Sequence, residues 1–498
     1  MEFENTSMIE KIKKYIIDRP LIAMGIALYL IQFFSNRSLW LDEAFIANNI
    51  ISRDFLQLLN PLDYNQVAPI GFLLFTKLFS FIIPNSELGL RAFPLLCSIS
   101  SIVVFDKICR LLFQNKLAIT FCLSLFIFNN SLIYFASELK QYISDVFVVL
   151  ILYYTTIKYA PYLTTKYVQI IATGSICIIM SNITPIVLIC SGIYITIVNL
   201  KAILKSTRLQ KITVLLVSVW LGTFLMYYLL FLHNHPTKSI MIEYWSNAGG
   251  FILNKPYESS FWQTLLTKVL MVFYWTNLKG IIGAVFISLF FIGLLSTIYC
   301  RKYRFIILFI LPVIIHLTLS SFKLYPFDTR LVLYSAPLYI IIVTTGFEKL
   351  LYSKHIQKYN NPFMSGLIAL LFMAHFFFSK PFPIEREEIK KTFSYIKQKK
   401  QDGFPIYVYY GAKQALNYYQ NTNIFNSPNK LILGESSRDN RNKYIDDIKQ
   451  IKEPFWLLFS HAFENEDTFI IQKLDSLGYS RTESFEVTGA SVYLFGEN

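Results

Sequence analysis

Long apolar blocks separated by short polar loops occupy the chain from residue 20 to residue 379. A helix needs about 20 mostly apolar residues to cross a bilayer, and about eleven blocks approach this length. Hydrophobic residues make up 54% and charged residues 16% of the chain, whereas soluble domains have about 25% charged residues. The pattern predicts a multi-span α-helical membrane protein. The expected spans are residues 20–35, 89–105, 117–135, 143–158, 167–181, 183–200, 212–232, 280–299, 304–320, 331–347 and 362–379.

Basic residues gather in every second loop between these blocks. They lie at residues 11–19, 107–116, 158–166, 201–211, 301–304 and 349–358. Short loops rich in Lys and Arg remain in the cytoplasm, so the N-terminus is expected inside and the C-terminus outside. Topology also accounts for the net charge of +14, and no basic patch with interleaved aromatic residues indicates a nucleic-acid partner.

The region between the first two predicted spans, residues 36–88, is expected to form one long outside loop. Its apolar segment Ile70–Ile83 contains Lys77 and is shorter than a spanning helix, which favours a re-entrant or interfacial position. The segment Glu43–Leu59 is predicted to form a helix that lies on the membrane surface.

The composition changes near residue 380, where prolines and the charged run Glu385–Glu388 appear. We therefore divide the chain into a membrane domain, residues 1–379, and a soluble α/β domain, residues 380–498. The six cysteines all precede residue 380, which excludes a disulfide framework in the second domain. Its predicted helices are residues 387–400, 413–419, 444–452 and 467–478, and its predicted strands are residues 406–410, 455–460 and a final pair ending at residue 495.

Two adjacent acids, Asp42 and Glu43, directly follow the first apolar block. Acidic residues are favoured at helix N-termini, so they are explained as caps of the next helix. Alternatively, one of them is a general base that faces an outside cavity at the membrane boundary. The residues alone leave both interpretations open.

Two later outside loops also contain unusual polar residues. The loop Ser137–Tyr142 includes Glu138 and Lys140, and Asp145 begins the next apolar block, where a buried acid is usually functional unless it caps the helix. The segment Lys323–Arg330 contributes two cations that either extend to the headgroups or bind a phosphate. His233 and His235, without acidic or cysteine partners, are only a weak indication of zinc.

The order of these motifs along the chain resembles that in the GT-C glycosyltransferases. The branch it resembles most contains the protein O-mannosyltransferases and aminoarabinose transferases. The segment Leu39–Ala44 resembles the first outside loop of that family, where an Asp is the expected catalytic residue. Ala68–Leu74 looks like its His-Pro-Pro-Leu region, with Val67 and Ala68 in place of the His and first Pro. Ser86–Pro94 is similar to the start of its second span. Ser137–Asp145 and Tyr325–Arg330 resemble two later outside segments.

The resemblance implies an inverting glycosyltransferase of the bacterial cytoplasmic membrane. It would move a sugar from a polyprenyl-phosphate-linked donor to a glycan, lipid or protein acceptor on the outer face. Asp42 would act as the base, while Glu43 or Asp145 would orient the acceptor or hold a divalent metal ion, the only cofactor to consider. The residues expected to contact substrate are Arg91, Glu138, Lys140, Tyr142, Lys323, Tyr325 and Arg330.

Two other classes of membrane protein compete with this interpretation. A lipid-linked glycan transporter or flippase would show inverted repeats and paired broken helices, which the sequence lacks. An O-antigen ligase or polymerase would carry its key residues in a large late loop and would not need acids directly after the first span.

Overall fold

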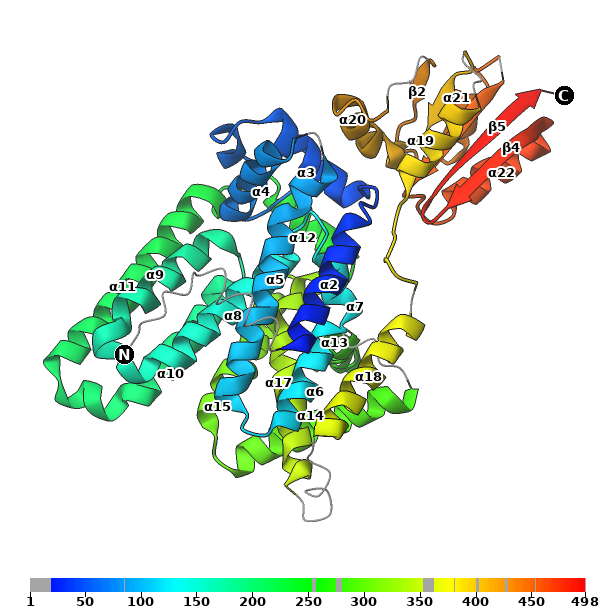
Figure 1. Cartoon of the computed structure of the whole chain (residues 1–498). Helices are drawn as coiled ribbons and strands as arrows, with labels where there is room; N and C mark the ends of the chain where they lie inside the picture. The colour runs from blue at the N-terminus through cyan, green and yellow to red at the C-terminus, as the bar shows by residue number, and fades with distance from the viewer. Residues whose placement is uncertain are drawn as a thin grey trace, which may run out of the picture.

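The computed structural model describes residues 19–84, 86–252, 257–274, 280–352, 362–379, 381–399, 403–425, 429–452 and 454–497. A large bundle of helices is joined to a small domain that contains a β-sheet, and the chain ends in this domain (Figure 1). The basic residues at positions 11–14, together with Lys354 and Lys358, lie outside the described residues.

The predicted apolar blocks all lie in helices. These are α2 (Pro20–Phe34), α5 (Glu87–Leu112), α6 (Lys116–Ile127), α7 (Asn130–Phe135), α8 (Tyr142–Tyr159), α9 (Leu163–Met180), α10 (Thr184–Lys205), α11 (Thr207–Tyr227), α14 (Gly280–Tyr299), α15 (Tyr303–Phe309), α16 (Leu311–Ser321), α17 (Ala336–Leu351) and α18 (Pro362–Ser379). Within the described residues, five helical stretches are long and apolar enough to cross a membrane, or six if the bent pair α15–α16 is one span. The predicted count of about eleven spans is therefore not confirmed, because several blocks, such as those in α2 and α6, form shorter helices.

Close packing of α14 on α17 depends on two glycines. A Cβ atom on Gly346 would lie 1.9 Å from the carbonyl oxygen of Leu289, and one on Gly293 would lie 2.1 Å from that of Ile342. Helices in a membrane associate through such small residues because apolar lipid gives no hydrophobic drive for association. Because neither glycine has a side chain, the backbones of α14 and α17 come into direct contact.

The segment between α2 and α5 forms α3 (Leu41–Ser52), a 3-10 turn (Gln57–Leu59) and α4 (Ile70–Ile82). The predicted helix over residues 43–59 is wrong at its C-terminal end, because Arg53 is extended and the Asp54 carboxylate accepts a 2.7 Å bond from the Gln57 amide. The α4 helix has 13 residues, so it is as short as the sequence indicates. Its Lys77 ammonium donates to the Ile50 carbonyl at 2.6 Å and ties α4 to α3.

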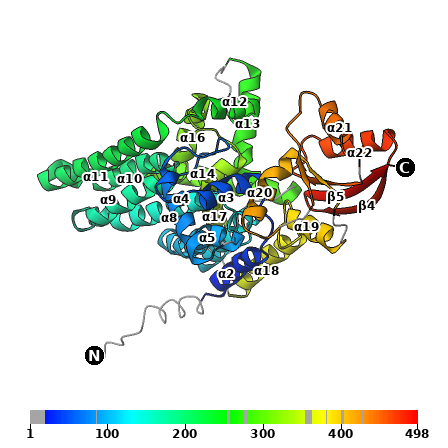
Figure 2. The ribbon, with the colours of Figure 1, turned by 90° about the horizontal axis from the view of Figure 1, so that it is seen from above.

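Two helices form in the long region between α11 and α14, where the sequence predicted only a loop. They are α12 (Lys238–Asn247) and α13 (Ser259–Tyr274). They lie together at one edge of the bundle when the molecule is seen from above (Figure 2), and α13 contacts the segment Thr329–Ser335 that leads into α17.

The C-terminal region contains a five-stranded sheet with the order β2-β1-β3-β5-β4. The strands are β1 (Ile406–Val408), β2 (Leu431–Leu433), β3 (Phe455–Ser460), β4 (Tyr479–Val487) and β5 (Ala490–Glu497), and the helices are α19 (Ile389–Gln398), α20 (Lys413–Asn421), α21 (Asn442–Ile448) and α22 (Glu466–Ser476). The first three strands are parallel, whereas β5 pairs antiparallel with β3 and β4. All predicted elements are present. Among the described residues of this region, the three-residue β2 and the 3-10 helix Tyr410–Ala412 were missed.

The two faces of this sheet pack on different helices because alternate side chains point to opposite faces. Ile406, Val408 and Trp456 belong to a core with α19 and α20, while Tyr407 and Leu457 pack with α21 and α22. The α20 helix then lies against α3 of the first segment (Figure 2). The division at residue 380 stays a prediction.

Candidate functional site

The site begins at the first turn of α3, which carries Asp42 and Glu43. Consecutive helix residues point about 100° apart, so the two carboxylates diverge. The Asp42 side chain keeps 21% of its surface exposed, whereas that of Glu43 is completely buried. The two acids therefore have different environments and cannot share one role.

Glu43 is enclosed by two guanidinium groups. Arg91 Nη2 and Arg37 Nη1 lie 2.7 and 2.9 Å from Glu43 Oε2, and Arg91 Nε lies 2.9 Å from Oε1. The Leu139 amide also donates to Oε1 at 2.7 Å. Burial opposes the charged form, but the two arginines lower the pKa of Glu43 to about 2. Glu43 thus joins α3, α5 and the Ser137–Gln141 turn through a buried ion pair.

Arg91 is fully occupied by this network. Its remaining nitrogen, Nη1, donates to the Arg37 carbonyl at 2.6 Å, and Nη2 also reaches the Ser38 carbonyl at 3.1 Å. With 1% of its surface exposed, Arg91 is placed to hold the chain before Asp42 rather than to meet a phosphate directly.

Asp42 forms an ion pair with Arg330. Arg330 Nη1 donates to Asp42 Oδ2 at 2.5 Å, and the Arg330 side chain is 24% exposed. Arg330 lies in the 3-10 helix Thr329–Ser335, just before α17, and its guanidinium carbon is 5.7 to 5.9 Å from the ring centres of Trp40, Tyr142 and Trp245. The aromatic rings attract the cation and fix its position beside the carboxylate.

Lys140 is the second cation near Asp42. Its ammonium donates to Gln66 Oε1 at 2.9 Å, and burial lowers the pKa of Lys140 although the charge of Asp42 opposes that shift. Burial alone would raise the pKa of Asp42, but the positive charges of Lys140 and Arg330 have the larger effect and lower it. The result is an ionised, partly accessible carboxylate that pairs with Arg330 and feels the charge of Lys140.

Glu138 is completely buried beside Trp40. The Trp40 indole donates to Glu138 Oε1 at 2.8 Å, whereas Oε2 has no partner among the described residues. Burial and the charge of Glu43 raise the pKa of Glu138 to about 7. Glu138 therefore holds Trp40 and has no direct bond to Asp42.

Asp145, Tyr142 and Tyr325 form a neighbouring polar group. Asp145 is buried in the first turn of α8 and accepts a 2.6 Å hydrogen bond from Ser181 Oγ. Burial and then the charge of Asp145 raise the pKa of the Tyr325 phenol. The Arg330 guanidinium carbon lies 5.9 Å from the ring centre of Tyr142, so Tyr142 connects α8 to the Asp42–Arg330 pair.

Lys323 is not brought to this group. It is exposed after α16 and forms no ion pair or side-chain hydrogen bond with other residues that the structure describes. In the same described part of the chain, no three His, Cys, Asp or Glu side chains gather as metal ligands would. His235 instead bonds Thr237 Oγ1 at 2.8 Å.

Several residues at the site were missed from the sequence. Arg37, Trp40 and Gln66 belong to the first segment, while Arg386 stacks on Trp40 with its guanidinium carbon 3.2 Å from the ring centre. The charged run at Arg386 was visible in the sequence, but it indicated only the start of a soluble region.

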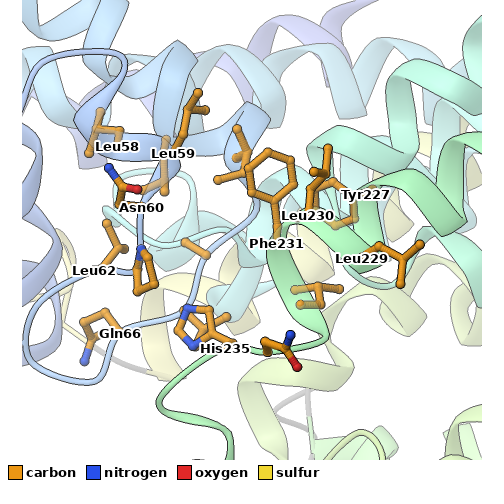
Figure 3. A pocket seen from close by; sticks show the side chains of 17 residues that line it. Leu58, Leu59, Asn60, Leu62, Gln66, Tyr227, Leu229, Leu230, Phe231 and His235 are labelled. Atoms are coloured by element: carbon orange, nitrogen blue, oxygen red, sulfur yellow. The ribbon is translucent and has the colours of Figure 1, made fainter.

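A pocket lies beside Gln66, the partner of Lys140 (Figure 3). Residues between positions 58 and 73 form one wall and residues between positions 227 and 235 the other, around a cavity of about 100 Å³. Gln66 and His235 line one part, and Leu230 and Phe231 another. The pocket therefore presents polar and apolar surface together, next to the Lys140 side of the site.

The helical bundle and the C-terminal sheet together have the fold of solved ArnT structures, which confirms the predicted resemblance at the level of the fold. In particular, the chain is similar to ArnT from Cupriavidus metallidurans bound to undecaprenyl phosphate, with a TM-score of 0.55, 11% identity, and coverage of 95% of this chain and 97% of that chain. The apo state of that ArnT has a TM-score of 0.40 at 13% identity, with the same coverage. No protein-family model and no curated protein matches the sequence.

Proposed function

We propose that this protein is an inverting glycosyltransferase that uses a polyprenyl-phosphate-linked sugar as donor. The observation that carries the proposal is the ion pair between Asp42 and Arg330, with Lys140 as a second cation, in a fold similar to that of an ArnT bound to undecaprenyl phosphate. In one site, the carboxylate can act as a base for the acceptor, and the nearby cations can bind the phosphate of the donor.

Arg330 and Lys140 are the proposed phosphate ligands. A guanidinium offers two parallel donors that match phosphate oxygens, and Arg330 is partly exposed. Lys140 adds a point charge, and the desolvated setting that lowers its pKa also strengthens its attraction to an anion. Lys323, which the sequence predicted in the same role, is exposed and is not included among the proposed ligands.

Asp42 is the proposed base. The acceptor oxygen or nitrogen attacks the anomeric carbon from the side opposite the phosphate, and its proton passes to Asp42. The bond between the anomeric carbon and the phosphate oxygen breaks, and its electron pair stays on the polyprenyl phosphate. The leaving group needs positive charge rather than a full proton, and Arg330 and Lys140 supply that charge. The anomeric configuration inverts because one displacement occurs.

The same cation couples binding to basicity. Arg330 lowers the pKa of Asp42 in the free protein. When a phosphate binds Arg330, its negative charge offsets part of the guanidinium charge. The pKa of Asp42 then rises, and the carboxylate becomes a stronger base. Donor binding therefore prepares Asp42 for the acceptor.

The other predicted site residues receive supporting roles. We assign Glu43 and Arg91 to hold the first turn of α3, because their polar atoms bond to one another and to nearby backbone. Asp145, with Tyr142 and Tyr325, is proposed to orient the acceptor, and Glu138 to fix Trp40. The proposed steps use protein side chains alone, since the described residues form no cluster of metal ligands.

The site is proposed to work on the outer face of a bacterial cytoplasmic membrane, with the N-terminus inside and residues 380–498 outside. Support comes from the alternation of basic loops and from the apolar helices.

The direct test uses purified protein in lipid nanodiscs with undecaprenyl-phosphate mannose and undecaprenyl-phosphate aminoarabinose as donors. The measured product is free undecaprenyl phosphate in the presence of membrane glycolipid extract. Release that depends on Asp42 supports the proposal. The proposal is refuted if Asp42→Asn releases undecaprenyl phosphate at the wild-type rate. It is also refuted if Arg330→Ala and Lys140→Ala bind undecaprenyl phosphate as tightly as the wild type does.

A further inference from the structure

The N-terminus of α3 has no cap from its own chain segment. Trp40 occupies the cap position in an extended conformation and makes no side-chain cap hydrogen bond. The first amides of any helix have no partner inside the helix and need acceptors from elsewhere. Because Asp42 follows the first helical residue, the way these amides are satisfied decides how firmly Asp42 is held.

The acceptors come from beyond residue 380. The Leu41 amide donates to Glu387 Oε2 at 3.1 Å, and the Leu39 amide donates to the Tyr419 hydroxyl at 2.8 Å. The Ser38 amide lies 3.3 Å from Glu388 Oε1. Three backbone amides that lead into the first turn of α3 thus depend on side chains more than 340 positions later in the sequence.

Side-chain contacts reinforce this junction. The Lys390 ammonium donates to the Asn36 carbonyl at 2.6 Å and pairs with Glu87 at 2.7 Å. Arg386 lies over the ring of Trp40, and Glu138 accepts a hydrogen bond from the indole N–H at the edge of the same ring. Both the backbone and the side chains of the residues before Asp42 are therefore held by contacts with the C-terminal region.

Glu387 occupies the central position in this junction. One of its oxygens receives the Leu41 amide, and the other lies 2.8 Å from His461 Nδ1, at the end of β3. With 6% of its surface exposed, the carboxylate has little freedom to rotate. The sheet thereby fixes Glu387, and Glu387 fixes the helix start.

We infer that the C-terminal domain caps α3, the helix that carries Asp42, and that Glu387 is a positioning residue for Asp42. As far as catalysis is concerned, this rests on the proposed transferase function. Loss of the cap lets the first turn of α3 fray, so that Asp42 spends less time at the distance from Arg330 that the reaction needs. A displacement of this kind at a reacting group costs up to about 100-fold in rate.

The experiment compares Glu387→Ala with Glu387→Gln in full-length protein in nanodiscs. Gln keeps an oxygen that accepts the Leu41 amide, so it serves as the conservative rescue. The matched control is Glu385→Gln, since the Glu385 side chain is 40% exposed and pairs with Lys391 away from α3. Amide hydrogen exchange of the peptide that covers residues 38–45 is measured alongside kcat and KM with undecaprenyl-phosphate donors.

In Glu387→Ala, we expect exchange at residues 38–42 to rise at least tenfold and kcat to fall about tenfold, with KM for the donor changed less than twofold. Glu387→Gln and Glu385→Gln should stay within twofold of wild type. Unchanged exchange in Glu387→Ala overturns the cap. Raised exchange with unchanged kcat, in a protein that Asp42→Asn inactivates, overturns the positioning role.

Failure of the transferase proposal is recognised separately. If Asp42→Asn leaves sugar transfer intact, the base assignment fails, while hydrogen exchange still decides whether Glu387 caps α3. Recovery of slow exchange in Glu387→Gln supports the cap in that case, and its absence contradicts it.

Discussion

Arg330 donates to Asp42 at 2.5 Å although the two residues lie 288 positions apart in the chain. The pair joins the first turn of α3 to the segment that leads into α17. Each partner keeps about a fifth to a quarter of its side chain exposed, at 21% for Asp42 and 24% for Arg330. An ion pair that remains accessible can exchange its partners for a substrate, and four of the predictions below depend on this group and its surroundings.

Asp42→Asn should lower kcat by about 100-fold to 10,000-fold, because the amide cannot accept the acceptor's proton. Binding of undecaprenyl phosphate should be unchanged or tighter, since Arg330 no longer has a competing carboxylate. Initial rates and a direct lipid-binding assay measure the two effects. The control is Asp63→Asn, an exposed carboxylate of the same segment that pairs with Arg53. Full activity of Asp42→Asn would contradict the assignment of the base.

Arg330→Ala should weaken binding of undecaprenyl phosphate about 10-fold to 100-fold, because a charge-assisted hydrogen bond is worth roughly 1.5–3 kcal/mol. Arg330→Lys should recover only part of this, as it keeps the charge but loses the two parallel donors. Lys323→Ala is the matched control and should bind normally, because Lys323 is exposed apart from the pair. Equal losses in the Arg330 and Lys323 variants would refute this distinction.

Glu138→Gln should change how stability depends on pH. The folded protein holds the Glu138 proton up to a pKa of about 7, whereas the ordinary value is 4.5. The folded state therefore binds more protons in this range, and stability falls as pH rises from about 4.5 to about 7. Gln keeps the bond from Trp40 without the charge. Its melting temperature relative to wild type should rise between pH 5 and pH 8, corresponding to roughly 1–3 kcal/mol. A constant difference would contradict the buried, proton-holding carboxyl.

Glu43→Gln should destabilise the fold by about 3–5 kcal/mol, because it leaves Arg37 and Arg91 buried without their counter-charge. The pKa of Glu43 is lowered to about 2, so its contribution is full above the ordinary value of 4.5 and is lost as pH falls toward 2. Thermal unfolding in detergent at pH 7 measures the loss. The exposed pair of Asp63 supplies the comparison, since its removal should cost less than about 1 kcal/mol.

The native Cys300 gives a test of the proposed topology. It is exposed and lies beside Arg301 and Lys302, in a loop predicted to be cytoplasmic, while the other five cysteines are buried. In intact cells, a membrane-impermeant maleimide should leave Cys300 unlabelled, and a permeant one should label it. Glu464→Cys, in the C-terminal domain, should react with both reagents. The reverse pattern would place the site on the wrong face of the membrane.

Local pattern was sufficient for most elements of the fold. The alternation of apolar blocks located the helices of the bundle, and short strand and helix signals located nearly the whole C-terminal sheet. These signals depend on residues within one or two turns of each other. The errors also have local causes: β2 has only three residues, and the helix that begins at Leu41 stops at Ser52, before the turn at Asp54.

The count of spans could not be obtained in the same way. Several apolar blocks are divided or shortened in the structure, as between α6 and α7, where Asn129 caps the second helix and accepts from the amides of Ser131 and Leu132. A hydropathy pattern averages over such a break, because the apolar residues continue on both sides of it.

By itself, the sequence determined that apolar helices dominate, that an acid follows the first of them, and that an α/β domain ends the chain. Only the tertiary structure separated Asp42 from Glu43, paired Arg330 with Asp42, and brought Glu387 to the start of α3. The physical reason is distance along the chain. Helix and strand signals arise between near neighbours, whereas burial and ion pairing arise between residues that meet only after the whole chain has folded.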